Sequence, residues 1–155
     1  METSSLRDAY DTFLYEAGSA TFGPDPGDSW SAQRVVAHMA VNDELLAATT
    51  RQLLDGDSNP AYDNAPAQNP ANLDAYAKSV GGMPGLIDAV RGSSEVLIQL
   101  IEILDEQVAD TVVPVRIKDG DEFAIDGPTP WSRIIRAQHA FHLPSHTDQL
   151  RALRA

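Results

Sequence analysis

Four segments of the chain repeat apolar residues at spacings of three and four, the pattern that aligns side chains on one face of an α-helix. Amphipathic helices of this length must cover their apolar stripes, and they do so by packing against one another. The pattern therefore predicts an all-α fold, a four-helix bundle. The expected helices cover about Ser4–Ala17, Ser31–Asp55, Pro84–Val108 and Pro130–Arg154.

Capping signals mark where two of these helices begin. Ser31 is a suitable N-cap, Trp30 precedes it, and Val35 is placed to complete a hydrophobic staple. Thr129 followed by Pro130 pairs an N-cap with a proline at the first helical position. These residues predict the starts of the second and the last helix.

The connections between the helices differ in character. Gly18–Asp28 is rich in Gly and Pro and predicts a loop. Asp57–Pro70 predicts a mobile surface loop, followed by a short helical turn over Asn72–Lys78. Two short apolar runs around Asp119-Gly120 predict a small β-hairpin inserted before the last helix, over Val113–Asp126. With no internal repeat or long linker, the 155 residues are expected to form one domain, 1–155.

The charge balance excludes several classes of partner. Lys and Arg number 11 against 23 Asp and Glu, a formal net charge of −12. Because nucleic acids and anionic membranes are bound through Lys and Arg, neither is expected as a partner. The absence of cysteine excludes disulfides, thiolate metal ligands and a protein thiol nucleophile. The start of the chain lacks a signal-peptide pattern and Val96–Leu104, the most apolar stretch, is too short to span a membrane, so a cytoplasmic protein is expected.

All 4 histidines fall on two of the predicted helices. His38 lies on the inward stripe of the second helix, where an unpaired imidazole is costly. His139, His142 and His146 lie on the last helix, within roughly 60° of one another on its surface. His142 and His146 are four residues apart and can point at one ion. Adding His38 completes a three-histidine metal site with open positions for water or substrate.

Other interpretations of these histidines stay open. An inward histidine is commonly a hydrogen-bonded core residue, and the Glu of the metalloprotease HExxH motif is absent, since Leu143, Pro144 and Ser145 separate the pair. Pro144 removes a helical hydrogen bond and disfavours the α conformation at Leu143, so the last helix is expected to kink or break there. A kink preserves the paired geometry and a break scatters it. His139 is then a substitute ligand or a partner of the ligands.

Two segments resemble those of a known family. The second predicted helix contains WSAQRVVAHMAVNDE, which resembles the helix of DinB-like proteins that carries a metal histidine after a Trp-Ser start. The last contains HLPSHTDQLRAL, which resembles their final helix with its HxxxH pair, and the hairpin before PWSRI is similar to an insert of some members. The resemblance covers most of the chain and implies a metal triad of His38, His142 and His146. His139 is not required by the family pattern, and Pro144 departs from it.

The resemblance also implies a chemistry. The family includes metal-dependent enzymes that use low-molecular-weight thiols, such as mycothiol-dependent maleylpyruvate isomerase and related thiol S-transferases. The resemblance therefore implies a divalent metal (Zn, Ni or Fe), a thiol cofactor such as mycothiol and a small-molecule substrate. Three neutral imidazoles leave the ion its double charge, so it would bind the thiol sulfur and lower the pKa of that thiol. Asn42, Asp43 and Glu44 follow His38 closely but are interpreted as solvated or packing residues.

Functions of other classes are kept beside this hypothesis. One is a non-catalytic stress-response or ligand-binding module whose metal site is structural or vestigial. Another is a binder of small apolar ligands, with Trp30, Trp131 and Phe141 lining a cavity. The wide apolar stripe of the third helix favours a homodimer, unless the segment Asp57–Gly82 covers it.

Overall fold

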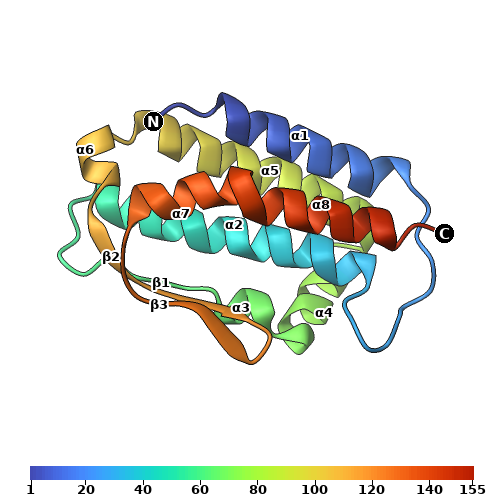
Figure 1. Ribbon diagram of the computed structural model, residues 1–155. Coiled ribbons are helices and arrows are strands. Elements are labelled where there is room, and N and C mark those ends of the chain that lie inside the picture. The colour runs from blue at the N-terminus through green and yellow to red at the C-terminus, as the bar shows by residue number, and fades with distance from the viewer.

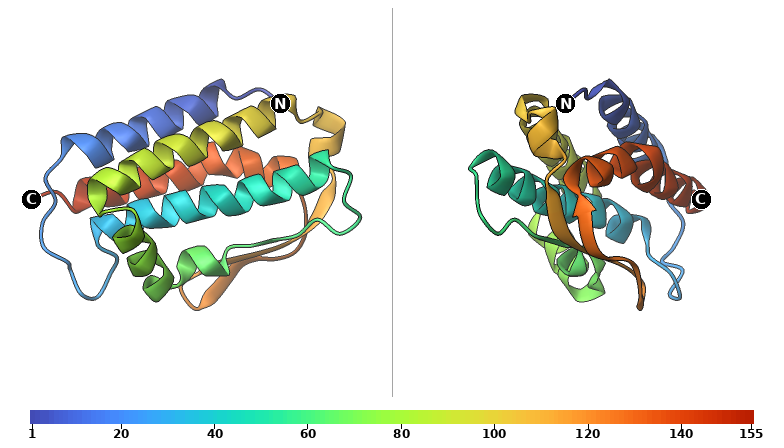
Figure 2. Two further views of the ribbon diagram at one scale, coloured as in Figure 1. Left: turned by 180° about the vertical axis from the view of Figure 1, so that it is seen from behind. Right: turned by 60° about the vertical axis from the view of Figure 1, so that its left-hand side comes forward.

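The computed structural model describes residues 1–155 and is mostly α-helical, with one three-stranded β-sheet. Four long helical segments lie side by side, and α3, α4 and the sheet lie along α2 on the side away from α1 (Figures 1 and 2). The four segments are α1 (Ser4–Ser19), α2 (Ala32–Leu54), α5 (Met83–Ile103) and a C-terminal helix composed of α7 (Trp131–Ala137), the π-helical turn η1 (Gln138–His142) and α8 (Leu143–Ala152).

Apolar residues from all four segments form the core, as the helical spacing predicts. The C-terminal helix packs against α1, and α5 packs against α2 and α1. The largest fully buried side chains are Trp131, Tyr10, Phe13, Leu6, Met39, Leu73, Leu86, Leu97, Ile101, Leu104, Leu143 and Leu150. Burial of this apolar surface supplies the main driving force for the fold.

The start of α2 follows its predicted cap. The Ser31 hydroxyl accepts a hydrogen bond from the backbone N–H of Arg34 at 3.3 Å. Trp30 and Val35 both pack into the core, as the predicted hydrophobic staple requires. This cap matters for the site, because His38 lies two turns further along the same helix.

The predicted mobile surface loop over Asp57–Pro70 is wrong from Tyr62 onward, where the chain has regular structure. This part of the chain forms β1 (Tyr62–Asp63) and α3 (Ala65–Gln68), and α4 (Pro70–Ser79) follows. The Asn64 side chain exchanges two hydrogen bonds with the backbone of Lys118, at 2.7 and 3.0 Å. The regular structure of the segment 62–68 therefore depends on contacts with a strand more than fifty residues away in the sequence. The local composition of the segment does not reveal these contacts.

The predicted β-hairpin is present and is longer than expected. β2 (Val112–Asp119) and β3 (Glu122–Pro130) pair antiparallel, and Gly120 in the turn has a φ of 63°, which favours glycine. β1 adds to β2 in parallel, giving the strand order β1-β2-β3. The sheet and α2 both contact α3, which carries Ala67 next to His38 of α2.

The third predicted helix ends five residues early. α5 stops at Ile103, Leu104 is extended, and Asp105 caps a separate short helix, α6 (Glu106–Ala109). The N-terminal amine of Met1 donates to the carbonyl oxygens of Ile101 and Leu104. These bonds satisfy carbonyl groups that would otherwise lack a partner at the end of α5. No helix of the protein combines the length and apolar character needed to cross a bilayer.

The last helix starts one residue later than predicted, and its predicted cap is wrong. Thr129 and Pro130 belong to β3, and α7 begins at Trp131. The Thr129 hydroxyl donates to the carbonyl oxygen of Gly127 and does not cap the helix. The backbone N–H of Trp131 donates to Thr111 instead, at 3.0 Å.

Candidate metal centre

The structure brings together the three histidines that the sequence singled out. His38 projects from α2, His142 from the end of η1 and His146 from α8. We call these three residues the histidine cluster. Each offers one nitrogen, and the three nitrogens lie within 4.8 Å of one another. His139 does not belong to this group.

The spacing of the rings suits a shared ion. The ring centroids lie 5.1 Å apart for His38 and His142, and 4.7 Å apart for the two pairs that include His146. The Nε2 atoms of His38 and His142 are 2.9 Å apart. Since a zinc–nitrogen bond is about 2.0–2.1 Å long, two nitrogens at this separation can share one ion.

Each imidazole of the cluster is oriented through its other ring nitrogen. In all three rings Nδ1 faces a carbonyl or amide oxygen, which can only accept, so Nδ1 carries the hydrogen and Nε2 is left with a free lone pair. The three pairs are His38 with the Ala67 backbone (2.6 Å), His142 with the Gln138 side chain (2.7 Å) and His146 with the Gln149 side chain (2.9 Å).

The lone pairs thus converge without a hydrogen between them. With Nδ1 protonated in both rings, neither Nε2 of the His38–His142 pair has a proton to donate, and a cation between these two atoms, 2.9 Å apart, would offset the repulsion of their lone pairs. A proton is a poor candidate for that cation. Burial, with a smaller contribution from the neighbouring imidazoles, lowers the pKa of His38 to about 3 and that of His142 well below its ordinary value. A metal ion meets the need without protonating either ring.

The π-helical turn reconciles Pro144 with the paired histidines. The helix was expected to kink or break at Pro144, but it continues through the wider turn η1, where the backbone N–H of Leu143 donates to the carbonyl of Gln138, five residues back. Pro144, which has no N–H to donate, then sits in the first turn of α8, where none is required. The side chains of His142 and His146 therefore still point to the same side of the helix. Gln138 lies one turn before His142.

The surroundings leave one side of the cluster accessible. His38 is 1% exposed, whereas His142 and His146 are half-buried. The Trp30 ring stacks on His146, with an interplanar angle of 10° and centroids 6.4 Å apart, and lies 5.1 Å from the His38 ring. Burial lowers the pKa of His146, and the charge of Asp119 at the end of β2 acts in the opposite direction. The Trp30 ring therefore lies against two of the three imidazoles.

The three polar residues that follow His38 closely have different environments. Asn42 is buried and accepts from the Tyr62 hydroxyl, as a packing residue does. Glu44 is exposed. Asp43, however, is completely buried, accepts hydrogen bonds from Tyr10 and Ser93, and has its pKa raised to about 8 by burial. The interpretation of Asp43 as an ordinary solvated or packing residue missed this environment.

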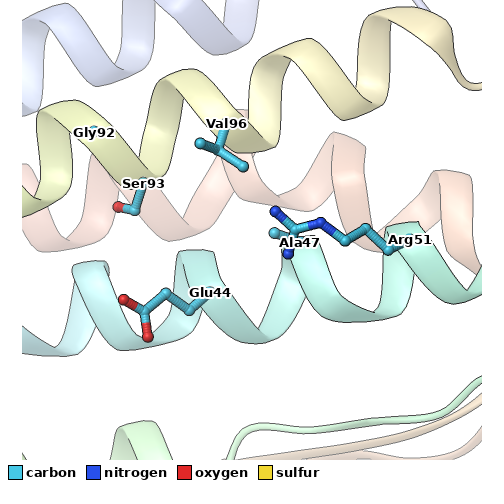
Figure 3. Close-up of a pocket in the computed structure, with 6 residues that line it drawn as sticks. All are labelled: Glu44, Ala47, Arg51, Gly92, Ser93 and Val96. Atoms are coloured by element: carbon cyan, nitrogen blue, oxygen red, sulfur yellow. The ribbon is translucent and has the colours of Figure 1, made fainter.

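Two hollows on the surface have linings that do not include the histidine cluster. One of about 220 Å³ lies between α2 and α5 (Figure 3), and one of about 280 Å³ lies between α1 and α8. The first is lined by Glu44, Ala47, Arg51, Gly92, Ser93 and Val96. The apolar cavity expected between aromatic residues is not supported, because Trp131 is fully buried against Tyr62 while Phe141 is 74% exposed.

Comparison of the chain with protein-family models, with curated proteins and with solved structures finds no match. The function of this chain therefore has to be inferred from the geometry of the site.

Proposed function

We propose that this chain is a divalent-metal-binding protein with a DinB-like four-helix bundle, whose ion is held by Nε2 of His38, His142 and His146. The observation that carries the proposal is the orientation of the three rings. Every Nδ1 is occupied by an oxygen acceptor, so every Nε2 presents a lone pair to the same small volume. Three imidazole nitrogens that offer lone pairs to one small volume form a set of ligands that suits a divalent cation.

Three imidazoles define the kind of ion that fits. Zn, Ni and Fe(II) all accept imidazole nitrogen, and three protein ligands leave further positions for water or a small molecule. The half-buried side at His142 and His146 gives such a molecule access, whereas the His38 side is closed. An anionic ligand is favoured there, because neutral imidazoles do not offset the charge of the ion.

For the reaction, we propose that the site activates a low-molecular-weight thiol such as mycothiol. The activated thiol is then either transferred to a small substrate or used to isomerise it. The bound ion supplies one effect, a lowered pKa of the cofactor's thiol. The chain has 0 cysteines, so the thiol has to come from a small molecule. The histidines hold the ion, and the Trp30 ring offers an apolar wall beside the open side of the site.

A structural role for the ion is the second candidate. It is favoured by the way the cluster joins distant parts of the chain, since His38 contacts α3 through Ala67 and meets the C-terminal helix through His142. Moreover, the buried Asp43 bonds to Tyr10 and Ser93 and not to the cluster, so it does not serve as a general base there. Calorimetric titration of the metal-loaded protein with mycothiol separates the two candidates: binding heat supports the first, and none supports the second.

Elemental analysis of purified variants tests the metal site itself. We expect about one equivalent of a divalent metal in the wild type and none in His38→Ala or His142→Ala, since each removes a ligand. His139→Ala is the matched control, because His139 lies on the same helical stretch but outside the cluster, and it should keep the metal. Equal loss in all three variants, or no metal in the wild type, contradicts the proposal.

A homodimer through α5 is proposed on the exposure of its apolar residues. Val96 is 40% exposed and Ile103 is 70% exposed. The segment Asp57–Gly82 does not cover them, since α4 packs mainly on α2. Light scattering should give twice the mass of the chain, and Ile103→Asp should give the monomer.

A further inference from the structure

A chain of buried hydrogen bonds leads away from His142 and joins all four long helical segments. It starts at Gln138, whose side-chain oxygen accepts from His142, and ends at a buried carboxylate. The links are Gln138 Nε2 to the Tyr10 hydroxyl (3.1 Å), the Tyr10 hydroxyl to Asp43 Oδ1, and the Ser93 hydroxyl to Asp43 Oδ2 (2.9 Å). The side chains are 4% exposed or less at Gln138, Tyr10 and Asp43.

The direction of these bonds is set at the Asp43 end. A carboxylate only accepts, so the single hydroxyl hydrogen of Tyr10 is used on Asp43. The same holds when Asp43 carries a proton on Oδ2, because Ser93 can then donate to the carbonyl oxygen of Val90, 3.3 Å away. In these two states the Tyr10 oxygen has only lone pairs left to offer to Gln138. A proton on Oδ1 of Asp43 would free the Tyr10 hydrogen instead, and the NH₂ group of Gln138 that faces Tyr10 fits the first two states.

The orientation of Gln138 follows from this. Its NH₂ group has to face Tyr10, and its oxygen therefore faces Nδ1 of His142. The one other neighbour of that NH₂ group, the Met39 sulfur at 3.5 Å, is a weak acceptor and does little to hold the amide. The tautomer of His142 that leaves Nε2 free is thus determined two side chains away.

The reverse orientation closes the site. If the amide turns over, its NH₂ group faces Nδ1 of His142, and the ring has to carry its hydrogen on Nε2. That hydrogen can be donated to Nε2 of His38, which lies 2.9 Å away. A hydrogen bond between the two rings then occupies the space of the ion, and both lone pairs are lost to a metal.

We propose that Tyr10 and Asp43 are positioning residues of the metal centre, which hold the Gln138 amide so that Nε2 of His142 stays free for the ion. The inference rests on the metal-binding function proposed above and deepens it. It differs from a purely structural role, in which losing the Tyr10 hydroxyl destabilises the fold but leaves the His142 tautomer unchanged.

The chain provides a matched control for this test. Tyr62 is also a buried tyrosine, and its hydroxyl donates to Asn42, the buried neighbour of Asp43 on α2. It contacts Trp131 and has no bond to Gln138. Tyr62→Phe therefore removes a comparable buried hydrogen bond without interrupting the connection to His142.

The experiment measures Co²⁺ binding and the His142 tautomer in parallel. Co²⁺ affinity is obtained by competition with a chelating dye and by its visible absorption, and the tautomer from ¹⁵N shifts of metal-free, histidine-labelled protein. We expect Tyr10→Phe to weaken Co²⁺ binding by about 10-fold or more and to populate the Nε2–H form of His142. Tyr62→Phe should match the wild type in both readouts. Asp43→Asn, which keeps the shape of the side chain, is a second variant should Tyr10→Phe fail to fold, and it should weaken binding several-fold.

The outcomes separate this inference from the proposed function. If the wild type binds Co²⁺ and Tyr10→Phe binds it equally well with an unchanged His142 tautomer, the positioning role is overturned and the metal site stands. An equal loss in Tyr10→Phe and Tyr62→Phe overturns it too, because it shows a general loosening of the core. If the wild type takes up no Co²⁺, the proposed function fails and this inference fails with it.

Discussion

Two polar clusters involve the C-terminal helix, and they differ in whether the protein completes them by itself. Glu16 of α1 is buried and accepts from Arg151 at 2.9 Å and also from Arg154, and the Arg151 bond contributes most to lowering the pKa of that carboxyl. Opposite charges are therefore already matched at this cluster. The histidine cluster contains only acceptors at its centre, and burial lowers the pKa of each of its rings. The first cluster is therefore complete by itself, whereas we propose that a cation completes the second.

The largest expected effect is that of an added ion on stability. Zn²⁺ at a hundred times its Kd should raise the free energy of unfolding of the wild type by about 2.7 kcal/mol, measured by thermal unfolding with and without the ion. His142→Ala should show no increment. Glu16→Gln should melt at a lower temperature, yet show the full increment, because its cluster is independent of the ion. An increment that disappears in Glu16→Gln would remove the distinction between the two clusters.

A smaller effect is expected from the acceptor of His146. Gln149→Leu removes the oxygen that holds Nδ1 of this ring and should weaken Zn²⁺ binding about 10-fold. The loss should be smaller than that of His146→Ala, since the ligand itself remains. Competition with a chelating dye measures both. Unchanged affinity in Gln149→Leu would mean that this ring is oriented by packing against Trp30 alone.

The pH dependence of stability gives an effect that is spread over several pH units. Burial raises the pKa of Asp43 to about 8, from an ordinary value of 3.8. Between these values the folded protein holds a proton that the unfolded chain has released, so this contribution to stability is complete below pH 3.8 and is lost as the pH rises through about 8. The unfolding free energy of the wild type should fall relative to Asp43→Asn over this window, by at most about 1.4 kcal/mol per pH unit. A difference that stays flat from pH 5 to 8 contradicts the burial of this carboxyl.

The positions of the long helices and the closeness of the three histidines were predictable, because both follow from the periodicity of the helix. His38 on one inward stripe and a pair four residues apart on another meet whenever those stripes pack together. The polar character of His38 also contributed to the prediction, since an imidazole on an apolar helix face needs a hydrogen-bond partner or a metal ion.

The rest of the site depends on contacts that local patterns do not encode. Tyr10 and Gln138 are 128 residues apart, and nothing near either one indicates their hydrogen bond. The order of the segment around Tyr62 likewise comes from pairing with a distant strand. Pro144 did signal an irregular helix, but both a kink and a break agreed with it, and the π-helical turn was not among the expected outcomes.

The most direct test of the central claim is the anomalous diffraction of crystals loaded with Zn²⁺, recorded at the zinc absorption edge. We expect a single strong peak per chain, with Nε2 of His38, His142 and His146 each about 2.0–2.1 Å from it. A peak at other residues, coordination through Nδ1, or three rings that stay in contact with no peak between them would contradict it.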